Sequence, residues 1–115
     1  MKLYLSGDSS YFYPDVMLVC GGEPPDRYYE TAPCLLVEVL SGSTAHNDRC
    51  HKYAAYTGIP SLQTYLIVSQ TERYVVEYQR TDGGWKMREH RGGGQVEVPC
   101  LGCLLSLEEM YRGVL

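Results

Sequence analysis

The run Cys34–Leu40, with the sequence CLLVEVL, places one glutamate, Glu38, in the middle of apolar residues. Apolar neighbours on both sides of Glu38 predict a strand that is buried on both faces. An isolated carboxylate in such a strand costs roughly several kcal/mol unless it is neutralised, paired or bound to a metal ion. Glu38 is therefore the first candidate for a chemical role.

A second carboxylate and a cation accompany Glu38 along the chain. Asp15 belongs to the segment PDVMLV, which predicts a strand, and Lys52 lies on a predicted helix. Antiparallel pairing of the two strands can place Asp15 nearly opposite Glu38, with Cβ atoms about 5 Å apart. Carboxylates that close repel each other unless one is protonated or a cation lies between them. Two strand-borne carboxylates followed by a lysine suggest phosphodiester chemistry with a divalent metal ion.

The predicted elements run in the order three strands, helix, strand, hairpin and final helix. We predict strands over 2–6, 13–20 and 34–40, a helix over 45–57 that ends at a Gly-Ile-Pro sequence, and a strand over 63–69. Segments 73–80 and 85–90 flank an Asp-Gly-Gly turn and predict a hairpin, and 95–99 predicts an edge strand. Ser106–Glu109 matches a capping box and should open a short C-terminal helix. The expected fold is α/β, with a mixed β-sheet and one main helix after the third strand.

The composition fits one folded domain over residues 1–115. No apolar stretch approaches the roughly 20 residues needed to span a bilayer, and the first residues do not form a secretory signal, so we expect a cytoplasmic protein. The five cysteines are irregularly spaced, which does not favour a secreted disulfide framework. The formal net charge of −4 argues against a nucleic-acid binder, although bound metal ions would offset the acidic site.

Four fragments, taken in order, resemble one bacterial family. They are Tyr13–Val16 (YPDV), Leu36–Thr44 (LVEVLSGST), the pattern DRxxKxxxY from Asp48 to Tyr56, and the segment Gly58–Val68 that begins with GIPSL. As an ordered set they resemble the Uma-type putative restriction endonuclease family, which is abundant in cyanobacteria and belongs to the PD-(D/E)XK nuclease superfamily. The resemblance runs from Met1 to Arg80.

The resemblance implies a restriction-endonuclease-like fold and a hydrolase that cuts DNA with Mg²⁺ or Mn²⁺. Asp15 and Glu38 would be the metal ligands, with help from the Val39 carbonyl. Leu40 occupies the position where the superfamily usually carries its lysine, so Lys52, on the following helix, becomes the candidate to support the attacking water.

The superfamily core begins with a helix before the first strand, whereas this chain begins at the strand. We therefore expect an N-terminally reduced domain. A missing helix would leave one sheet face uncovered, which predicts a homodimer or an exposed apolar patch.

The same residues allow other interpretations. Glu38 and Lys52 could form a structural ion pair in a catalytically inactive nuclease fold that serves as a binding or assembly module. Lys52 could instead pair with Asp48 on the surface of the helix. The helix also has two possible buried faces. The first consists of Cys50, Tyr53, Ala54 and Thr57. The second consists of Ala45, Lys52, Tyr53 and Tyr56, and it is the face that fits the resemblance.

Cysteines and basic residues supply two further alternatives. Four cysteines could form a tetrahedral zinc site in a small interaction domain, although core or turn positions are favoured for them. A basic face on the predicted hairpin could contact DNA, although a solvated face is commoner. His90 ends a hairpin strand and is expected to be exposed. The cysteines are Cys20, Cys34, Cys100 and Cys103, and the basic residues are Arg73, Arg80, Lys86, Arg88 and Arg91.

Overall fold

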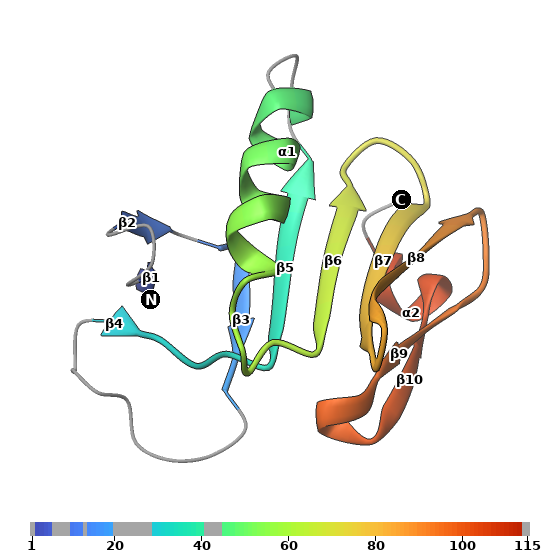
Figure 1. Cartoon of the computed structure of the whole chain (residues 1–115). Helices are drawn as coiled ribbons and strands as arrows, with labels where there is room; N and C mark the ends of the chain where they lie inside the picture. Colours follow the sequence, from blue (N-terminus) through green and yellow to red (C-terminus); the bar gives the residue numbers. More distant parts are fainter. Residues whose placement is uncertain (1, 6–9, 13, 20–28, 41–44, 114–115) are drawn as a thin grey trace.

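A mixed sheet of five strands forms the centre of the described part of the chain (Figure 1). The structure is a computed structural model, and it describes residues 2–5, 10–12, 14–19, 29–40 and 45–113. The strands lie in the order β3, β5, β6, β7 and β8, and all neighbours are antiparallel except β5 and β6. They are β3 (Val16–Leu18), β5 (Leu35–Leu40), β6 (Thr64–Ser69), β7 (Tyr74–Thr81) and β8 (Gly84–Arg91).

Helix α1 (Ala45–Tyr56) connects β5 to β6. Parallel neighbouring strands need a crossover connection, and α1 supplies it by crossing one face of the sheet (Figure 1). The helix ends just before the Gly-Ile-Pro sequence, as predicted, and the amide of Ile59 bonds to the carbonyl of Tyr56. Among the described residues, no helix is long and apolar enough to cross a membrane.

Smaller elements complete the chain on both sides of the sheet. Three short strands form a separate small sheet in the order β2, β1, β4. Strands β9 and β10 pair with each other and are connected by a short 3₁₀ turn. The C-terminal helix α2 (Leu107–Tyr111) begins with the predicted capping box between Ser106 and Glu109. The strands are β1 (Lys2–Leu5), β2 (Ser10–Phe12), β4 (Tyr29–Glu30), β9 (Gln95–Val98) and β10 (Cys103–Ser106).

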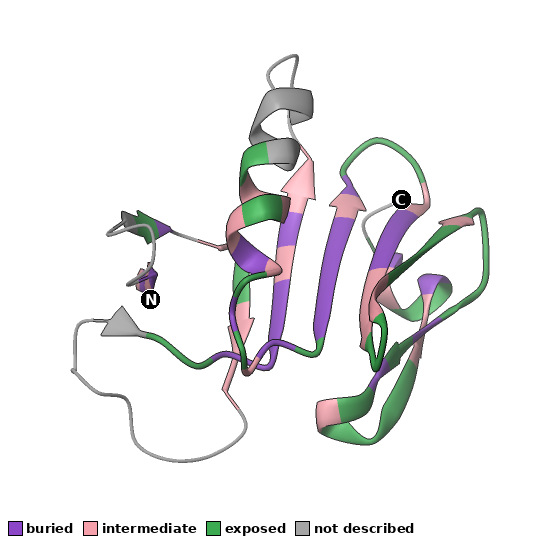
Figure 2. Cartoon of the chain, viewed as in Figure 1, coloured by how far each residue is buried: buried purple, intermediate pink, exposed green. Residues whose placement is uncertain are grey.

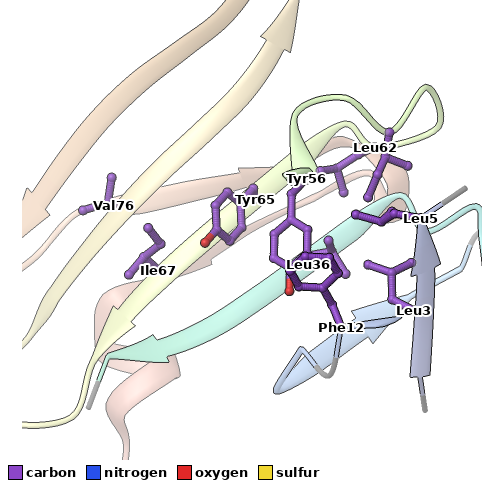
Figure 3. Close-up of a cluster of buried hydrophobic side chains, with 10 residues drawn as sticks. Leu3, Leu5, Phe12, Leu36, Tyr56, Leu62, Tyr65, Ile67 and Val76 are labelled. Carbon is purple, nitrogen blue, oxygen red and sulfur yellow. The ribbon is translucent and has the colours of Figure 1, made fainter. Parts of the chain in front are cut away.

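Each face of the sheet carries an apolar core in the described part of the chain (Figure 2). Side chains alternate along a strand, so the neighbours Leu35 and Leu36 of β5 belong to different cores. The core on the α1 face also includes β1 and β2 (Figure 3), and its buried residues are Leu3, Leu5, Phe12, Leu36, Tyr56, Ile59, Leu62, Tyr65, Ile67 and Val76. The opposite core joins the sheet to β9 and α2, through Leu35, Leu66, Val75, Val96, Val98, Leu107 and Tyr111.

Three expectations from the sequence require correction. The segment 13–20 is not one strand, because β2 ends at Phe12 and β3 begins at Val16, so Asp15 lies between them; Tyr13 and Cys20 are outside the described residues. The strand predicted over 95–99 does not extend the main sheet, because β9 pairs with β10. The sheet face that the sequence predicted to be uncovered is largely covered, because β9 and α2 pack on the face opposite α1. The homodimer stays a prediction.

A buried glutamate, Glu77, ties β7 to β8 and β9. Its side chain is 1% exposed and accepts hydrogen bonds from His90 Nε2 at 2.8 Å, Gln79 Nε2 at 2.7 Å and the Glu97 amide at 3.2 Å. The expectation of an exposed His90 is therefore wrong, since its imidazole packs against Glu77 and is 15% exposed. Burial raises the pKa of Glu77, but these hydrogen bonds outweigh burial and leave the pKa below its usual value of 4.5.

Removing the Glu77 carboxylate should destabilise the fold. We expect Glu77→Ala to lower the free energy of unfolding by about 3 kcal/mol at pH 7, because a buried, bonded charge loses its partners. A depressed pKa gives stability that is present above the usual pKa and is lost as pH falls through the folded value. The difference between wild type and Glu77→Ala, measured by urea unfolding, should therefore shrink below about pH 4.5.

Glu72→Ala is the matched control, because Glu72 pairs with Arg91 at 3.3 Å while both side chains are more than half exposed. Its effect should stay below about 1 kcal/mol. Equal losses for the two variants would contradict a structural role for Glu77.

Candidate active site

The central candidate, Glu38, lies on β5 and faces helix α1. It shares this face with Leu36, and it is 6% exposed, as expected for a strand buried on both faces. Its neighbour across the parallel pair is Ile67 of β6, another core residue. The carboxylate is thus surrounded by apolar side chains in the sheet, and its hydrogen-bond partners come from other elements.

Helix α1 supplies two donors to Glu38. The Lys52 ammonium bonds to Oε2 at 3.0 Å, and the Tyr56 hydroxyl donates to Oε1 at 2.8 Å, so both carboxylate oxygens accept a hydrogen bond from α1. Lys52 and Tyr56 are four residues apart and therefore lie on the same face of the helix. Lys52 is 20% exposed, whereas Tyr56 is fully buried in the core beside Leu36 (Figure 3).

The helix uses the face that contains Lys52. Tyr56 is buried, and Tyr53 is half-buried with its ring against Tyr78 at 4.8 Å between centroids. Ala54, which belongs to the competing stripe, is exposed. That stripe is therefore wrong as the buried face; the side chains of residues 45–50, including Asp48 and Cys50, are outside the described part.

Asp15 reaches the same region from the segment before β3. The pairs Val16–Val37, Met17–Leu36 and Leu18–Leu35 continue to a register in which Asp15 lies opposite Glu38, as expected from the sequence. The Val39 amide donates to Asp15 Oδ2 at 2.7 Å, which fixes this carboxylate beside the strand that carries Glu38. Asp15 is exposed, so the site opens to solvent on this side.

The pKa of Glu38 is raised above its usual value of 4.5. Burial is the main cause, and the nearby charge of Asp15 acts in the same direction. Hydrogen bonds from Lys52 and Tyr56 and the charge of Lys52 lower the pKa but do not cancel the effect of burial. Burial therefore remains the dominant influence on the Glu38 carboxylate, and an additional cation beside it would lower its pKa.

Tyr56 was not predicted as a site residue, although the signal was present in the sequence. The pattern DRxxKxxxY places it one helical turn after Lys52, and on the helix face that meets Glu38. Tyrosines are abundant in this chain, which has eleven, so composition alone gave no reason to select one. The bond to Glu38 identifies its role.

The cysteines do not form the zinc site considered from the sequence. Cys34 is in a disulfide, whereas Cys100 and Cys103 carry thiols at the turn between β9 and β10. Cys20 is outside the described residues. Zinc is bound by cysteine thiolates, and a sulfur atom in a disulfide is not a thiolate, so Cys34 cannot complete a four-cysteine zinc site.

The basic residues of the β7–β8 hairpin do not form one face. Strand alternation places Arg80 and Arg91 on the α1 side and Lys86 and Arg88 on the other side. The Arg80 guanidinium bonds to the carbonyls of Ile59 and Leu62 and packs over the Trp85 ring, and that of Arg91 packs over Tyr74. The basic face considered as an alternative from the sequence is thus divided between two surfaces.

Comparison with known proteins identifies the family. The Uma2 family profile, described as "putative restriction endonuclease", matches residues 1–108. Two uncharacterized proteins of Synechocystis sp. are similar: slr1290 is 35% identical over 99% of this chain, and sll1609 is 39% identical over 80% of it. The chain spans 61% and 54% of the lengths of these relatives.

A solved structure supports the fold. The crystal structure of a putative nuclease belonging to DUF820 from Anabaena variabilis superposes with a TM-score of 0.66 at 17% identity, over 99% of this chain and 66% of that one. The expected restriction-endonuclease-like α/β architecture is therefore confirmed. Because the profile matches nearly the whole sequence, this chain belongs to the Uma2 family, which is described as putative restriction endonucleases.

Proposed function

We propose that this chain is a nuclease that hydrolyses DNA phosphodiester bonds with Mg²⁺ or Mn²⁺ held by Asp15 and Glu38. The observation that carries the proposal is the convergence of Asp15, Glu38 and Lys52, from three separate segments, around the second half of β5. Membership of the family supports a nuclease-like function.

The donor set suits a hard divalent cation. Among the described residues, no group of three or more His, Cys, Asp and Glu side chains could hold a metal ion. Mg²⁺ commonly uses one or two carboxylates and completes its coordination with water, a backbone carbonyl such as that of Val39, and substrate phosphate. When bound, such an ion would lower the pKa of a water molecule and stabilise charge on the scissile phosphate.

The chain's own residues would orient the reacting groups. The Tyr56 hydroxyl holds one oxygen of Glu38, and the Val39 amide holds one oxygen of Asp15, so both carboxylates have fixed directions. The Lys52 ammonium bonds to Glu38 Oε2 at 3.0 Å and is 20% exposed. From this position it can orient the attacking water or contact a phosphate oxygen as charge develops.

A catalytically inactive binding or assembly module is the second candidate function. The direct contact between Lys52 and Glu38 at 3.0 Å favours it, because a purely structural ion pair would have the same geometry. Such a pair would not respond to divalent ions. The two candidates therefore differ in whether a metal ion stabilises the protein through Glu38.

Glu38→Gln should make this distinction without an activity assay. Because the folded pKa is raised, the contribution of Glu38 to stability is fully present below about pH 4.5 and is lost as pH rises through the folded value. Relative to Glu38→Gln, the wild type should therefore become less stable with rising pH in thermal melts. Mn²⁺ at about 100 times its dissociation constant should raise the free energy of unfolding of the wild type by about 2.7 kcal/mol and leave that of Glu38→Gln unchanged.

Glu89→Gln, at an exposed position of β8, is the matched control and should behave as the wild type in both respects. No stabilisation of the wild type by Mn²⁺, or equal stabilisation of wild type and Glu38→Gln, would support the structural pair instead.

Lys52→Met should reduce cleavage of supercoiled plasmid in Mg²⁺ or Mn²⁺ by about 10²- to 10³-fold, because it removes a donor that acts on developing charge. Tyr56→Phe should cost about 10- to 100-fold, because it loosens the carboxylate that holds the metal but keeps the ring in the core. Lys86→Met, at an exposed lysine of β8, is the control and should retain wild-type activity. Equal activity of Lys52→Met and the control would remove Lys52 from the mechanism.

A further inference from the structure

The outer face of the small sheet carries an aromatic and basic cluster. Tyr4 of β1 lies directly opposite Tyr11 of β2 in the antiparallel pair. Leu3, Leu5 and Phe12 point into the core, so strand alternation places Lys2, Tyr4 and Tyr11 together on the opposite face.

The cluster has the geometry of a stacking platform. The Tyr4 and Tyr11 ring centroids are 4.9 Å apart with their planes tilted by 42°, and the Lys2 ammonium lies 5.1 Å from the Tyr11 centroid. Tyr11 is 48% exposed, one of the most exposed large apolar side chains in the described part of the chain. Exposed aromatic rings beside a cation are the means by which proteins bind unpaired nucleotide bases and their backbone.

The platform lies next to the candidate active site. Tyr11 precedes Asp15 by four residues, so their Cα atoms are at most about 14 Å apart. On the inner side of the same strand, Phe12 packs against the ring of His51 at a centroid distance of 5.6 Å. It also packs against the ring of Tyr56 at 5.5 Å (Figure 3). Because Tyr11 points to the face of the small sheet opposite Phe12, a strand stacked on Tyr11 would have to continue past the segment that carries Asp15 to reach the two carboxylates.

The charge of the chain favours unpaired bases over a duplex. With a net charge of −4 and a hairpin whose basic residues are divided between two faces, the chain is poorly suited to binding that depends on many phosphate contacts. Base stacking needs few such contacts, because every base offers a π-face. In a duplex these faces are covered by neighbouring base pairs.

We propose that Lys2, Tyr4 and Tyr11 form a binding site for single-stranded DNA. Tyr11 stacks on a base, Tyr4 supports that ring from β1, and the Lys2 ammonium contacts the backbone phosphate. The assignment of the bound strand as substrate rests on the proposed nuclease function, and it narrows the substrate to DNA with an unpaired segment.

The test is fluorescence anisotropy of a dye-labelled 20-nucleotide oligothymidine in EDTA, where no divalent ion is present. Tyr11→Ala should weaken binding by about tenfold or more, because stacking on an aromatic ring is lost. Tyr11→Phe should bind within about twofold of the wild type, because it keeps the ring. Met87→Ala, at a 50% exposed apolar residue of β8, is the control for loss of exposed apolar surface and should bind as the wild type.

A duplex of the same length and a salt series complete the test. The duplex should bind the wild type at least tenfold more weakly than the oligothymidine, and Lys2→Met should reduce the salt slope by about 1. Equal binding of the duplex, wild-type binding by Tyr11→Ala, or no oligothymidine binding at all would overturn the platform. Because EDTA prevents metal-dependent cleavage, stacking can be established even if hydrolysis is never found, and hydrolysis can be found while stacking fails.

Discussion

The burial of one carboxylate, that of Glu38, governs the arrangement of the elements around the candidate site. β5 is apolar on both faces apart from this residue, so α1 has to bring polar groups to it from above the sheet. Lys52 and Tyr56 do this from adjacent turns, and Asp15 is held alongside by the Val39 amide. The connection β5–α1–β6 and the register of β3 both place polar groups beside the Glu38 carboxylate. The candidate site therefore depends on how the sheet and the helix pack together.

The two glutamates buried in the described sheet differ in how far the protein compensates their charge. Glu77 receives bonds from His90, Gln79 and a backbone amide, and its pKa is lowered. Glu38 receives bonds from Lys52 and Tyr56, lies near the negative charge of Asp15, and has a raised pKa. Both are buried in the same sheet, on opposite faces. Hydrogen bonds outweigh burial at Glu77, whereas burial outweighs them at Glu38, which is why Glu38 is the one we propose as a metal ligand.

Much of the main sheet and of the candidate site could be predicted from the sequence, because a single charged residue interrupts an otherwise apolar strand. The CLLVEVL run predicted β5, the Gly-Ile-Pro stop predicted the end of α1, and the resemblance selected the helix face that carries Lys52. The role of Tyr56 was missed although the DRxxKxxxY pattern contained its signal. The partners of Glu77 could not be predicted, since they depend on contacts between strands that are distant in sequence. The pairing of β10 with β9 could not be predicted either, and from the sequence β9 was expected to be an edge strand. Periodicity describes each element alone, whereas these features arise from how the elements meet.

The central claim is that Asp15 and Glu38 together hold a divalent ion, and calorimetric titration with Mn²⁺ tests it most directly. It does not depend on knowing the substrate. We expect the wild type to bind Mn²⁺ at one site per chain, and Asp15→Asn and Glu38→Ala each to abolish binding. Glu108→Ala, which removes an exposed carboxylate of α2, should leave it unchanged. Absence of Mn²⁺ binding by the wild type, or binding that survives in Glu38→Ala, would contradict the account and leave a nuclease fold whose buried glutamate is structural.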